Sequence, residues 1–450
     1  MPRTLDDPAP SNVRGECPSV HAPFVELDGA LLRVRLPGGA VSVAAARTIA
    51  DVVAAVGGGP IELTNRANLQ LRGIPLESVA IVREELVAAG VTDRDPEADG
   101  RRNVLTSPTA GVDPGELADT GALVAAVADR LTAPAAAGLS AKFGVLVDGG
   151  GEVHVRGRAH DLAVGAVRGR DGAVRYEVCL AGALPLTHAP DELVWLVDPP
   201  SVLDVVDAAI AMCARFGRAR DLLDTVGPDR VWTDLSRRAH DGLRPHRGDV
   251  VLDGRGATQV PVGVRPQRRP GRVMVGAVPV LGRLDAATLR TLADVADRVG
   301  PGELRISPWR GVVLTDVAET DAASVVAAWT RAGLVCDPAH PANLDVACAG
   351  NQGCAAGRVD TQADARRLIE RLRELPVDRR PRSVHVSGCE KGCARPQPTA
   401  CSLVAGTAPG TYDLHVDRPG ATDRRFGDRV QSALDPDTAI DAVLAAGLVR

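Results

Sequence analysis

Two segments far apart in the chain share one pattern of apolar and polar positions. Residues 47–57 read RTIADVVAAVG and residues 290–300 read RTLADVADRVG, with seven of eleven positions identical at an offset of 243. In both segments the aliphatic residues recur at a spacing that places them on one face of a helix. The pattern therefore predicts two related amphipathic helices.

The segments that follow these two helices also correspond. PIELTNRANLQLRGI (60–74) and GELRISPWRGVVLTDV (302–317) each contain a strand pattern, a polar corner and a second strand pattern. The order helix, strand, turn, strand is the same in both. We therefore interpret the chain as two copies of one α+β module.

The second half of each copy extends this correspondence. In the later copy, DVACAGNQGCAAGRVDT leads to a predicted helix at about 362–375, with Thr361 as its N-cap, and then to a strand at Ser383–Val386. In the earlier copy, NVLTSPTAGVDP leads to a predicted helix at about 115–131 and then to the strand AKFGVLVD. The equivalent loops of the earlier copy carry no cysteine and present polar and basic groups instead, at Thr106, Ser107 and Lys142.

The composition narrows the class of protein. The 450 residues are 45% apolar and 24% charged, which is typical of a globular chain of two to four packed units. The net charge of −5 gives no signal for nucleic-acid binding. We find neither a secretory signal nor an apolar stretch of the roughly 18 residues that span a membrane. We therefore expect a cytoplasmic monomer with no nucleic-acid or membrane partner.

Five of the nine cysteines fall between residues 348 and 401. Cys348 and Cys354 form a C-x5-C pair, and Cys389 and Cys393 form a C-x3-C pair within VSGCEKGCARP. Clustered cysteines in a cytosolic chain indicate a metal site more than disulfides. Two thiol pairs on separate loops can supply the four thiolates of a 4Fe-4S cubane, whereas zinc more often uses narrower spacings. We assign these four residues as cluster ligands, with zinc and four packed thiols as the alternatives.

Glycines accompany both cysteine pairs. Gly350, Gly353, Gly388 and Gly392 would let the backbone approach the sulfurs closely and direct N–H groups at them. Two further cysteines are interpreted differently. Cys401 falls in a predicted strand as a packed small residue, and Cys336 has no partner at ligand spacing.

These cysteines and several other motifs resemble the sulfite and nitrite reductase haemoprotein superfamily. C-x5-C followed by SGCxxGC resembles its cluster motif, TNRANLQLRG (64–73) its first basic motif, and RNVLTS (102–107) its second. AKFG (141–144) resembles its lysine-bearing strand, and GTAPGTYDLHVD (406–417) its closing turn and strand. The similarity covers nearly the whole chain, and the catalytic chain of that superfamily is itself an internal duplication.

The resemblance implies a fold class and a division of the chain. The class is α+β, an internally duplicated sulfite/nitrite reductase haemoprotein-like fold with ferredoxin-like half-domains plus two cofactor lobes. An Arg-, Gly- and Pro-rich linker between the copies is predicted at 243–272. The expected parts are a first half-domain at 1–80, a first lobe without a cluster at 81–242, a second half-domain at 255–322, and a second lobe with the 4Fe-4S cluster at 323–450.

Within the superfamily, the precorrin-3B synthases of aerobic cobalamin biosynthesis fit better than the reductases. RGECPSVHAPFVELDGALLRVRLPGG (14–39) resembles the start of these enzymes, and SGCEKGCARP resembles their second cysteine pair. Sulfite reductases carry K-x-K on the lysine-bearing strand, but here Lys142 and Phe143 are followed by Gly144. The missing second lysine is awkward for a small dianionic substrate and suits a bulky tetrapyrrole.

The same resemblance implies a flat tetrapyrrole with several carboxylates beside the cluster. Arginine pairs with carboxylates bidentately and keeps its charge. A strand in which polar and apolar residues alternate would place Arg66, Asn68, Gln70 and Arg72 on one face, although ordinary surface strands alternate in the same way. The residues predicted to bind the tetrapyrrole are Arg66, Asn68, Gln70, Arg72, Arg102, Asn103 and Lys142.

The implied reaction is a monooxygenation. The enzyme would hydroxylate precorrin-3A with dioxygen and close a lactone, and the cluster would pass electrons one at a time. An external reductase or ferredoxin, ultimately fed by NAD(P)H, is expected as donor, because no G-x-G-x-x-G motif follows a strand. A mononuclear non-haem iron is a further candidate cofactor. Its only recognisable motif is H-x-D at His415–Asp417, which His188, His240 or His246 could complete, and we assign neither iron ligands nor catalytic residues.

Two other functions stay open. In a sirohaem-dependent sulfite or nitrite reductase, Cys393 would join the cluster to the sirohaem iron. A non-catalytic iron–sulfur protein that binds a tetrapyrrole would retain the same arginines. Only turnover would separate this binding protein from the two enzymes.

Overall fold

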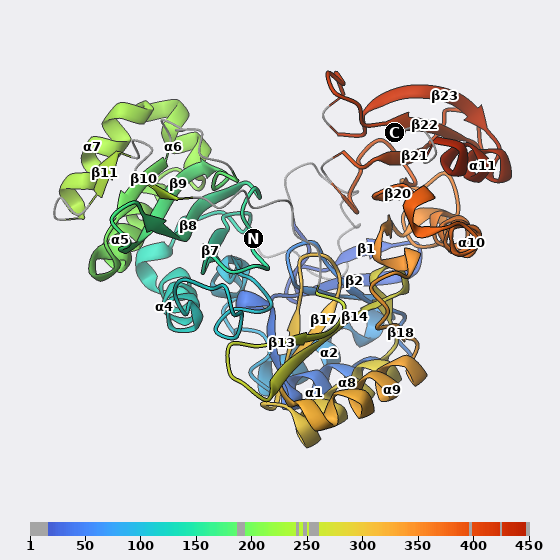
Figure 1. Cartoon of the computed structure of the whole chain (residues 1–450), viewed down its shortest axis with the longest axis horizontal. Coiled ribbons are helices and arrows are strands. Elements are labelled where there is room, and N and C mark those ends of the chain that lie inside the picture. Colours follow the sequence, from blue (N-terminus) through green and yellow to red (C-terminus); the bar gives the residue numbers. More distant parts are fainter. Residues whose placement is uncertain are drawn as a thin grey trace.

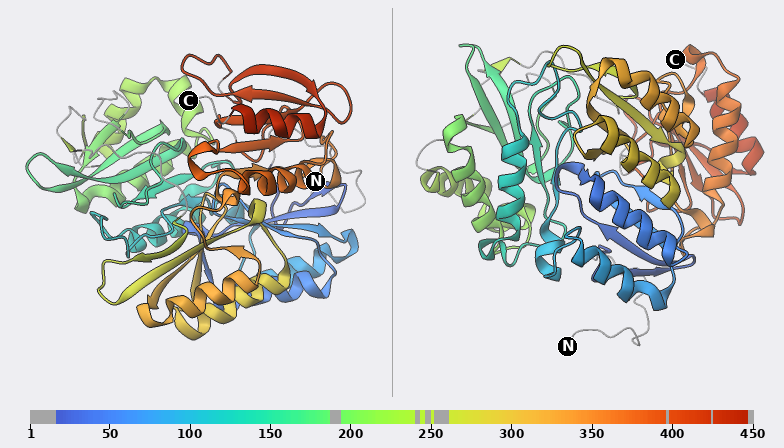
Figure 2. Two further views of the ribbon diagram at one scale, coloured as in Figure 1. Left: turned by 45° about the vertical axis from the view of Figure 1, so that its right-hand side comes forward. Right: turned by 90° about the horizontal axis from the view of Figure 1, so that it is seen from below.

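The computed structural model describes residues 17–186, 194–239, 243–245, 250–251, 261–395, 398–423 and 425–446. Two half-domains form the base of the molecule, with a layer of helices on their outer side (Figure 1). Two lobes stand on this base, the first in green on one side and the second in orange and red on the other (Figure 1). Figure 2 shows the same arrangement from two further directions.

The first half-domain is an antiparallel sheet covered by two helices. Its strand order is β1-β2-β5-β4-β15. The predicted helix at 47–57 and the two strands within 60–74 are confirmed. The elements are β1 (Phe24–Glu26), β2 (Gly29–Val34), α1 (Val43–Ala55), β4 (Ile61–Leu63), β5 (Leu69–Ile74) and α2 (Val79–Ala88), while β15 (Arg283–Leu284) comes from the second copy.

The second half-domain repeats this plan. Its strand order is β13-β14-β17-β16-β3, and β18 pairs with β14. The two copies exchange one short strand each, because β3 (Ala40–Ser42) of the first copy pairs with β16 and β15 pairs with β4. The elements are β13 (Gly263–Pro266), β14 (Arg272–Pro279), α8 (Ala286–Val299), β16 (Glu303–Ile306), β17 (Val312–Ala318), α9 (Ala322–Arg331) and β18 (Leu334–Val335).

Helices α1 and α8 pack against each other between the copies. Arg47 of α1 donates to Asp294 of α8 at 2.8 Å, and Arg290, which occupies the equivalent position 243 residues later, pairs with Asp51. Apolar side chains of both copies merge into one core beneath the sheets. Its members include Leu32, Ile49, Leu71, Leu292, Leu314 and Trp329, all fully buried.

The first lobe is built on a sheet ordered β11-β10-β9-β8-β7-β6, with β12 beside β8. Strands β6, β7 and β8 are parallel, and β9 and β10 continue antiparallel. Strands β11 and β12 come from the segment predicted as a linker, and β13 of the second half-domain follows them. The strands are β6 (Val104–Leu105), β7 (Val145–Asp148), β8 (His160–Gly169), β9 (Val174–Gly182), β10 (Val194–Val197), β11 (Leu243–Pro245) and β12 (Val250–Val251). The helices are α3 (Pro96–Arg101), α4 (Gly121–Thr132), α5 (Val202–Cys213), α6 (Ala219–Val226) and α7 (Pro228–Arg238).

The second lobe has the same sheet plan as the first. Its order is β19-β20-β21-β22-β23, in which the first three strands are parallel and the last two antiparallel. A helix crosses over between the first two strands in each lobe, α4 in one and α10 in the other. The duplication therefore includes the lobes. The elements are β19 (Asp345–Ala347), α10 (Thr361–Arg373), β20 (Val384–Ser387), β21 (Cys401–Ala405), β22 (Tyr412–Val416), β23 (Asp428–Leu434) and α11 (Pro436–Ala446).

Two predicted helix starts need correction. Helix α4 begins at Gly121 and not near residue 115, because the carboxylates of Asp113 and Asp119 accept hydrogen bonds from the backbone N–H groups of Gly115 and Gly121 and hold a turn there. The N-cap of α10 is Asp360, whose carboxylate accepts from the Ala363 N–H, in place of Thr361. Among the described residues, no helix is long and apolar enough to cross a membrane.

Candidate functional site

The two cysteine pairs lie on neighbouring loops of the second lobe. Cys348 follows β19 directly, and Cys389 follows β20 after Ser387 and Gly388. Strands β19 and β20 are parallel neighbours with Ala347 opposite Val386, so both loops leave the same edge of the sheet. The sequence-predicted ligands are thus brought together by the fold.

The surroundings of these thiols fit an iron–sulfur cluster. The Gly388 N–H donates to the Cys348 Sγ at 3.1 Å, a contact typical of cluster thiolates. Burial raises the pKa of the Cys393 thiol, and the nearby thiols of Cys389, Cys348 and Cys354 raise it further, so the four sulfurs share one neighbourhood.

The choice between a cluster and a single ion depends on how the four thiols are arranged. Among the described residues, no group of three His, Cys, Asp or Glu side chains could hold a metal ion. A structural zinc needs four ligands that converge on one point. A cubane binds each thiolate through a different iron, so its ligands surround a larger space. The two neighbouring cysteine loops offer four thiols around one cavity, which is the number that a cubane needs.

Two glycines of the cluster loops lie in tight surroundings or in a conformation that favours glycine. A Cβ on Gly388 would lie 3.3 Å from Gly350 Cα and 3.4 Å from Cys348 Sγ. Gly350 has φ +63°, a backbone conformation that residues other than glycine rarely adopt. The tight loops and the N–H contact to sulfur therefore depend on the glycines that the sequence singled out.

A cavity of about 430 Å³ opens beside the four cysteines, and we call it the thiol cavity. Its other walls come from the first half-domain and from the turn between β16 and β17. Arg310 of that turn donates to the carbonyl of Ala394 at 2.9 Å, next to Cys393. The first half-domain contributes Cys17, Phe24, Glu26, Leu31, Arg33, Glu62, Arg66, Gln70 and Arg72.

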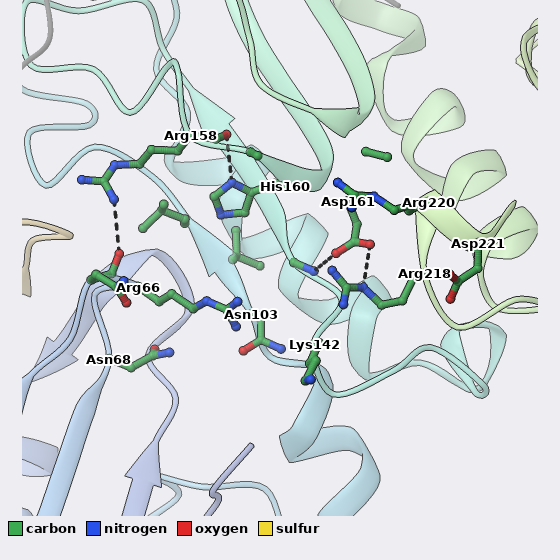
Figure 3. Close-up of a pocket in the computed structure, with 16 residues that line it drawn as sticks. Arg66, Asn68, Asn103, Lys142, Arg158, His160, Asp161, Arg218, Arg220 and Asp221 are labelled. Atoms are coloured by element: carbon green, nitrogen blue, oxygen red, sulfur yellow. Dashed lines mark hydrogen bonds and ion pairs between the residues drawn. The ribbon is translucent and has the colours of Figure 1, made fainter. Parts of the chain in front are cut away.

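A second cavity, of about 470 Å³, lies in the first lobe, and we call it the basic cavity. Asn65 and Arg66 line both cavities, so the two meet at the turn between β4 and β5. Figure 3 shows the side chains of this cavity, with Asp161 between the Gly144 N–H and the Arg218 guanidinium. The charged and polar residues that line it include Arg66, Asn68, Asn103, Lys142, Arg158, His160, Asp161, Arg218, Arg220 and Asp221.

The predicted alternation from Arg66 to Arg72 is only partly correct. Strand β5 begins at Leu69, and Ala67 before it has φ +56°, so Arg66 and Asn68 belong to a turn. Gln70 and Arg72 do lie in β5 and line the thiol cavity, whereas Asn68 lines the basic cavity. The left-handed residue interrupts the pleat, and the four side chains divide between two cavities.

Arg72 is already engaged with other residues of the chain. It donates to both carboxylate oxygens of Asp28, at 2.8 and 3.1 Å, and to the carbonyl of Gly353 in the first cysteine loop. Burial opposes the charge of Glu62, but Arg283 and Arg72 outweigh it and hold the pKa of Glu62 below its usual value. Arg72 therefore joins the first half-domain to the cysteine loop, and its contact with a tetrapyrrole stays a prediction.

Other predicted binding residues lie near the basic cavity in different roles. Asn103 donates to the carbonyls of Ala141 at 3.0 Å and Phe143 at 3.1 Å, and so fixes the loop that carries Lys142. Lys142 lines the cavity, and its ammonium forms no ion pair with the described residues. Arg102 lines neither cavity and instead donates to the carbonyl of Val91 at 3.1 Å.

The placement of Lys142 in the equivalent of a cysteine loop was wrong. The loop of the first lobe that corresponds to Cys389 follows β7 and consists of glycines at 149–151. Lys142 precedes β7 and therefore lies at the opposite, amino-terminal edge of the parallel strands. The sequence pattern could not show which edge of the sheet faces the centre of the molecule.

Sequence reasoning missed several cations that line the cavities. Arg158 stacks over the Trp309 ring at 5.2 Å and donates to the carbonyl of Asn65. Burial, together with the nearby charge of Arg395, lowers the pKa of Arg158 to about 10. One of these residues had a signal in the repeat, because Arg310 lies in the turn that matches TNRAN. The others missed are Arg33, Arg218 and Arg220.

The structure gives no support for a mononuclear iron site. His415 Nδ1 lies 3.1 Å from the carbonyl of Gly427, and its ring packs against Phe426. The described residues contain no three-residue metal site that includes it. His188, His240 and His246, which could have completed the set, lie outside the described residues.

Comparisons with known proteins agree with this geometry. The nitrite/sulfite reductase ferredoxin-like half domain matches residues 26–89 and 265–331, and the nitrite and sulphite reductase 4Fe-4S domain matches residues 97–230. Together these segments make up more than half of the chain. The chain belongs to the nitrite and sulfite reductase superfamily. Its homologues are oxidoreductases.

Relatives with different names are similar to the chain to the same degree. The ferredoxin–nitrite reductase of Leptolyngbya laminosa is 28% identical over 435 residues, which cover 90% of this chain and 84% of that protein. The precorrin-3B synthase of a Sinorhizobium species is 27% identical over 411 residues, which cover 90% and 83%. The structure of the Mycobacterium tuberculosis NirA protein has the same fold, with a TM-score of 0.70 at 22% identity over 92% of this chain and 79% of that one. The predicted fold class is confirmed.

The match to a 4Fe-4S domain falls on the first lobe, which has no thiols suited to a cluster. Its described cysteines are Cys179 in β9 and Cys213 in α5, and both are buried in the lobe. Burial raises the pKa of Cys213 to about 12, which disfavours a thiolate. Membership of the superfamily implies an iron–sulfur cluster, and the loops of the second lobe are the described part of the chain that suits one.

Proposed function

We propose that this protein is a monooxygenase of the precorrin-3B synthase type, which hydroxylates a polycarboxylated tetrapyrrole with dioxygen. The observation that carries the proposal is the pair of cavities that meet at Asn65 and Arg66. One cavity adjoins the cysteine loops and the other is lined by cations. A flat ligand that spans both would contact the cluster side and the cationic side at once.

The charge of the basic cavity supports a ligand with several carboxylates. Five Arg and Lys side chains line it against two Asp, in a chain whose net charge is −5. Asp161 is already neutralised by Arg218 and by the backbone N–H groups of Gly144 and Ala219. Cations held together without counter-charges are costly, and an anionic ligand would relieve that cost.

The thiol cavity has the same electrostatic character near Arg33. Burial, together with the charges of Arg66 and Arg35, lowers the pKa of Arg33 to about 10, although Cys17 acts in the opposite direction. Arg33 also donates to Gln70 at 2.7 Å, which fixes its position. A carboxylate at this point would find a cation that is already oriented.

The cluster ligands in this proposal are Cys348, Cys354, Cys389 and Cys393. A bound cluster supplies single electrons, and the two electrons that the reaction needs come from an external donor, a ferredoxin or a reductase fed by NAD(P)H. The names of the ferredoxin-dependent relatives support a donor of this kind. In the balanced reaction one oxygen atom enters the substrate and the other leaves as water.

The proposal can be tested by purification and turnover under defined conditions. The protein is purified without oxygen, its visible spectrum is recorded, and iron and acid-labile sulfide are counted. It is then given the tetrapyrrole, dioxygen and a reduced ferredoxin, and the product is weighed by mass spectrometry. We expect a broad cluster band without haem bands, and a product that has gained one oxygen atom.

The main alternative is a sirohaem-dependent reductase of sulfite or nitrite. It is favoured by the nitrite reductases among the relatives and by the exposure of Cys393 in the thiol cavity. Sirohaem bands that shift on adding sulfite or nitrite would establish this function and exclude the monooxygenase. A cluster protein that binds the tetrapyrrole but converts neither substrate would be the binding protein, and absence of sulfide would return zinc as the metal.

A further inference from the structure

His160, the first residue of β8, lines the basic cavity. Its Nδ1 lies 3.2 Å from the carbonyl oxygen of Arg158. A carbonyl oxygen only accepts hydrogen bonds, so Nδ1 carries the proton in this contact. In the neutral ring the other nitrogen, Nε2, is then an acceptor. Figure 3 shows His160 on the same wall of the cavity as Arg158, with Arg66 and Asn103 below it in the view.

The ring stays neutral because of where it lies. Burial lowers the pKa of His160 to about 4, and the charges of Arg66 and Arg158 lower it further, while the Arg158 carbonyl and Asp161 act in the opposite direction. At neutral pH the cavity therefore holds an uncharged imidazole among cations. Its Nε2 keeps a lone pair where most neighbouring groups are hydrogen-bond donors.

Gly144 leaves the space that this ring occupies. A Cβ on Gly144 would lie 3.3 Å from the Cδ2 atom of His160, closer than most such contacts in proteins. A longer side chain at position 144 would have to displace the imidazole or be displaced by it. Gly144 stands where sulfite reductases carry a second lysine. Its small size leaves room for the neutral imidazole of His160, which can accept a hydrogen bond.

Three other acceptor side chains around His160 are already occupied, and Asp221 lies beside Arg218 on the other side of Asp161 (Figure 3). The carboxylate of Asp161 accepts from Gly144, Arg218 and Ala219. The side-chain oxygens of two asparagines in the cavity wall also have donors, Arg35 for Asn103 and the Leu36 N–H for Asn68. A ligand that brings a donor group to this wall would therefore find its acceptor at His160.

We propose that His160 Nε2 accepts a hydrogen bond from an N–H or O–H group of the bound tetrapyrrole, beside the cations that bind its carboxylates. The inference rests on the proposed function and adds a residue that selects the ligand. A tetrapyrrole carries both carboxylates and N–H groups, so it matches both parts of the wall. Nitrite offers only lone pairs and would gain nothing from a neutral acceptor.

The test is a binding titration with uroporphyrin III, an octacarboxylic tetrapyrrole with N–H groups. The cluster-loaded protein is titrated at pH 7 and at several salt concentrations, and the dissociation constant is read from the visible spectrum. The variants are His160→Phe, which removes the acceptor, His160→Gln, which retains one, and Lys142→Met, which removes a cation. Circular dichroism and the cluster band confirm that each variant is folded and loaded.

We expect His160→Phe to weaken binding about tenfold and His160→Gln to stay within about threefold of the parent, because an unpaired buried donor is costly. Lys142→Met should weaken binding and reduce its salt dependence, whereas His160→Phe should leave the salt dependence unchanged. The inference is wrong if His160→Phe binds uroporphyrin as tightly as the parent, or if the parent binds nitrite more tightly than His160→Phe does. Either result would leave the proposed function standing. Absence of uroporphyrin binding by the parent protein would overturn the proposed function itself.

Discussion

The two lobes share a sheet plan but use opposite edges of it. In the second lobe, the cysteines follow β19 and β20, at the carboxyl ends of parallel strands. In the first lobe, Asn103, Lys142 and Arg158 precede β6, β7 and β8, at the amino ends. One duplicated scaffold thus presents thiols from one lobe and cations from the other.

The two edges of the sheet present different kinds of polar group to a bound ligand. Glycine-rich loops at the carboxyl edge bring backbone N–H groups to sulfur, as Gly388 does for Cys348. At the amino edge of the first lobe the polar groups are side chains. The amide of Asn103 donates to two backbone carbonyls and so fixes the loop that carries Lys142. Gly149 and its neighbours occupy the carboxyl edge there, where the second lobe has its cysteines.

The comparison fails at once if the cluster is not held by the second lobe. Cys389→Ser should remove the cluster almost completely, because serine is a poor substitute for a thiolate ligand. Iron and acid-labile sulfide counts after anaerobic purification would show the loss. Cys336→Ser serves as the matched control, since Cys336 is half-buried outside the thiol cavity. Equal loss of sulfide in both variants would contradict the assignment.

The lobes should also differ in how strongly they are fixed to the half-domains. Arg72→Met leaves Asp28 and the Gly353 carbonyl without their donor, and we expect it to cost about 3 kcal/mol of unfolding free energy. On the first lobe, Arg268 donates to the Glu116 carbonyl at 2.7 Å, but its side chain is 45% exposed. Arg268→Met should cost less than about 1 kcal/mol. Urea denaturation measures both, and equal losses would refute the difference.

Glu116 gives the first lobe a pH dependence of its own. Burial raises the pKa of Glu116 to about 7, against the effects of the Gly111 N–H and Arg268, and the nearby carboxylates of Asp119 and Asp113 raise it too. The folded chain then keeps a proton that the unfolded chain releases near pH 4.5, so stability falls as the pH rises from about 4.5 to about 7.

Glu116→Gln should remove this loss. We expect the variant to be about 1 kcal/mol more stable than the parent at pH 8, with the difference vanishing near pH 4.5. Urea denaturation at a series of pH values would follow it. A difference that is the same at every pH would show that Glu116 does not titrate as described.

The smallest expected effect is at the interface between the copies. Arg47 is paired with Asp294 and Asp297, and Arg290 is paired with Asp51, all at the surface. Exposed ion pairs contribute little, so Arg47→Ala and Arg290→Ala should each cost less than about 1 kcal/mol. Shifts of the urea midpoint would measure the two variants side by side. A loss of several kcal/mol from either would mean that the interface depends on its charges and not on its apolar core.

Local pattern was sufficient for much of the fold. The repeated helices at 47–57 and 290–300 lie in α1 and α8, and Cys401 is buried in β21 as its strand pattern predicts. The strand exchange was not predictable, because nothing in the three residues of β3 specifies that they pair with β16 instead of a strand of their own copy. Pairing partners are a property of the assembled sheets.

The candidate site shows the same limit. The cysteine spacing identified four thiols that the fold brings to one edge, since a ligand motif carries its chemistry locally. The basic cavity collects side chains from the turn between β4 and β5, from β6, β8, β9 and α6, and from their flanking loops, which no single stretch of sequence displays. Arg158 and His160 were missed because each stands alone in a strand region, and only the fold places them beside Arg66.

The exchange of β3 and β15 also bears on the origin of the chain. A single copy of this module would have an empty place at one sheet edge and a strand left over. Two separate copies would satisfy both needs by trading strands, which is the geometry of a domain-swapped homodimer. The present polypeptide holds both copies in one chain, so the two copies need not have the same sequence. The second lobe can therefore carry thiols at positions where the first lobe has none, and the first lobe can carry cations.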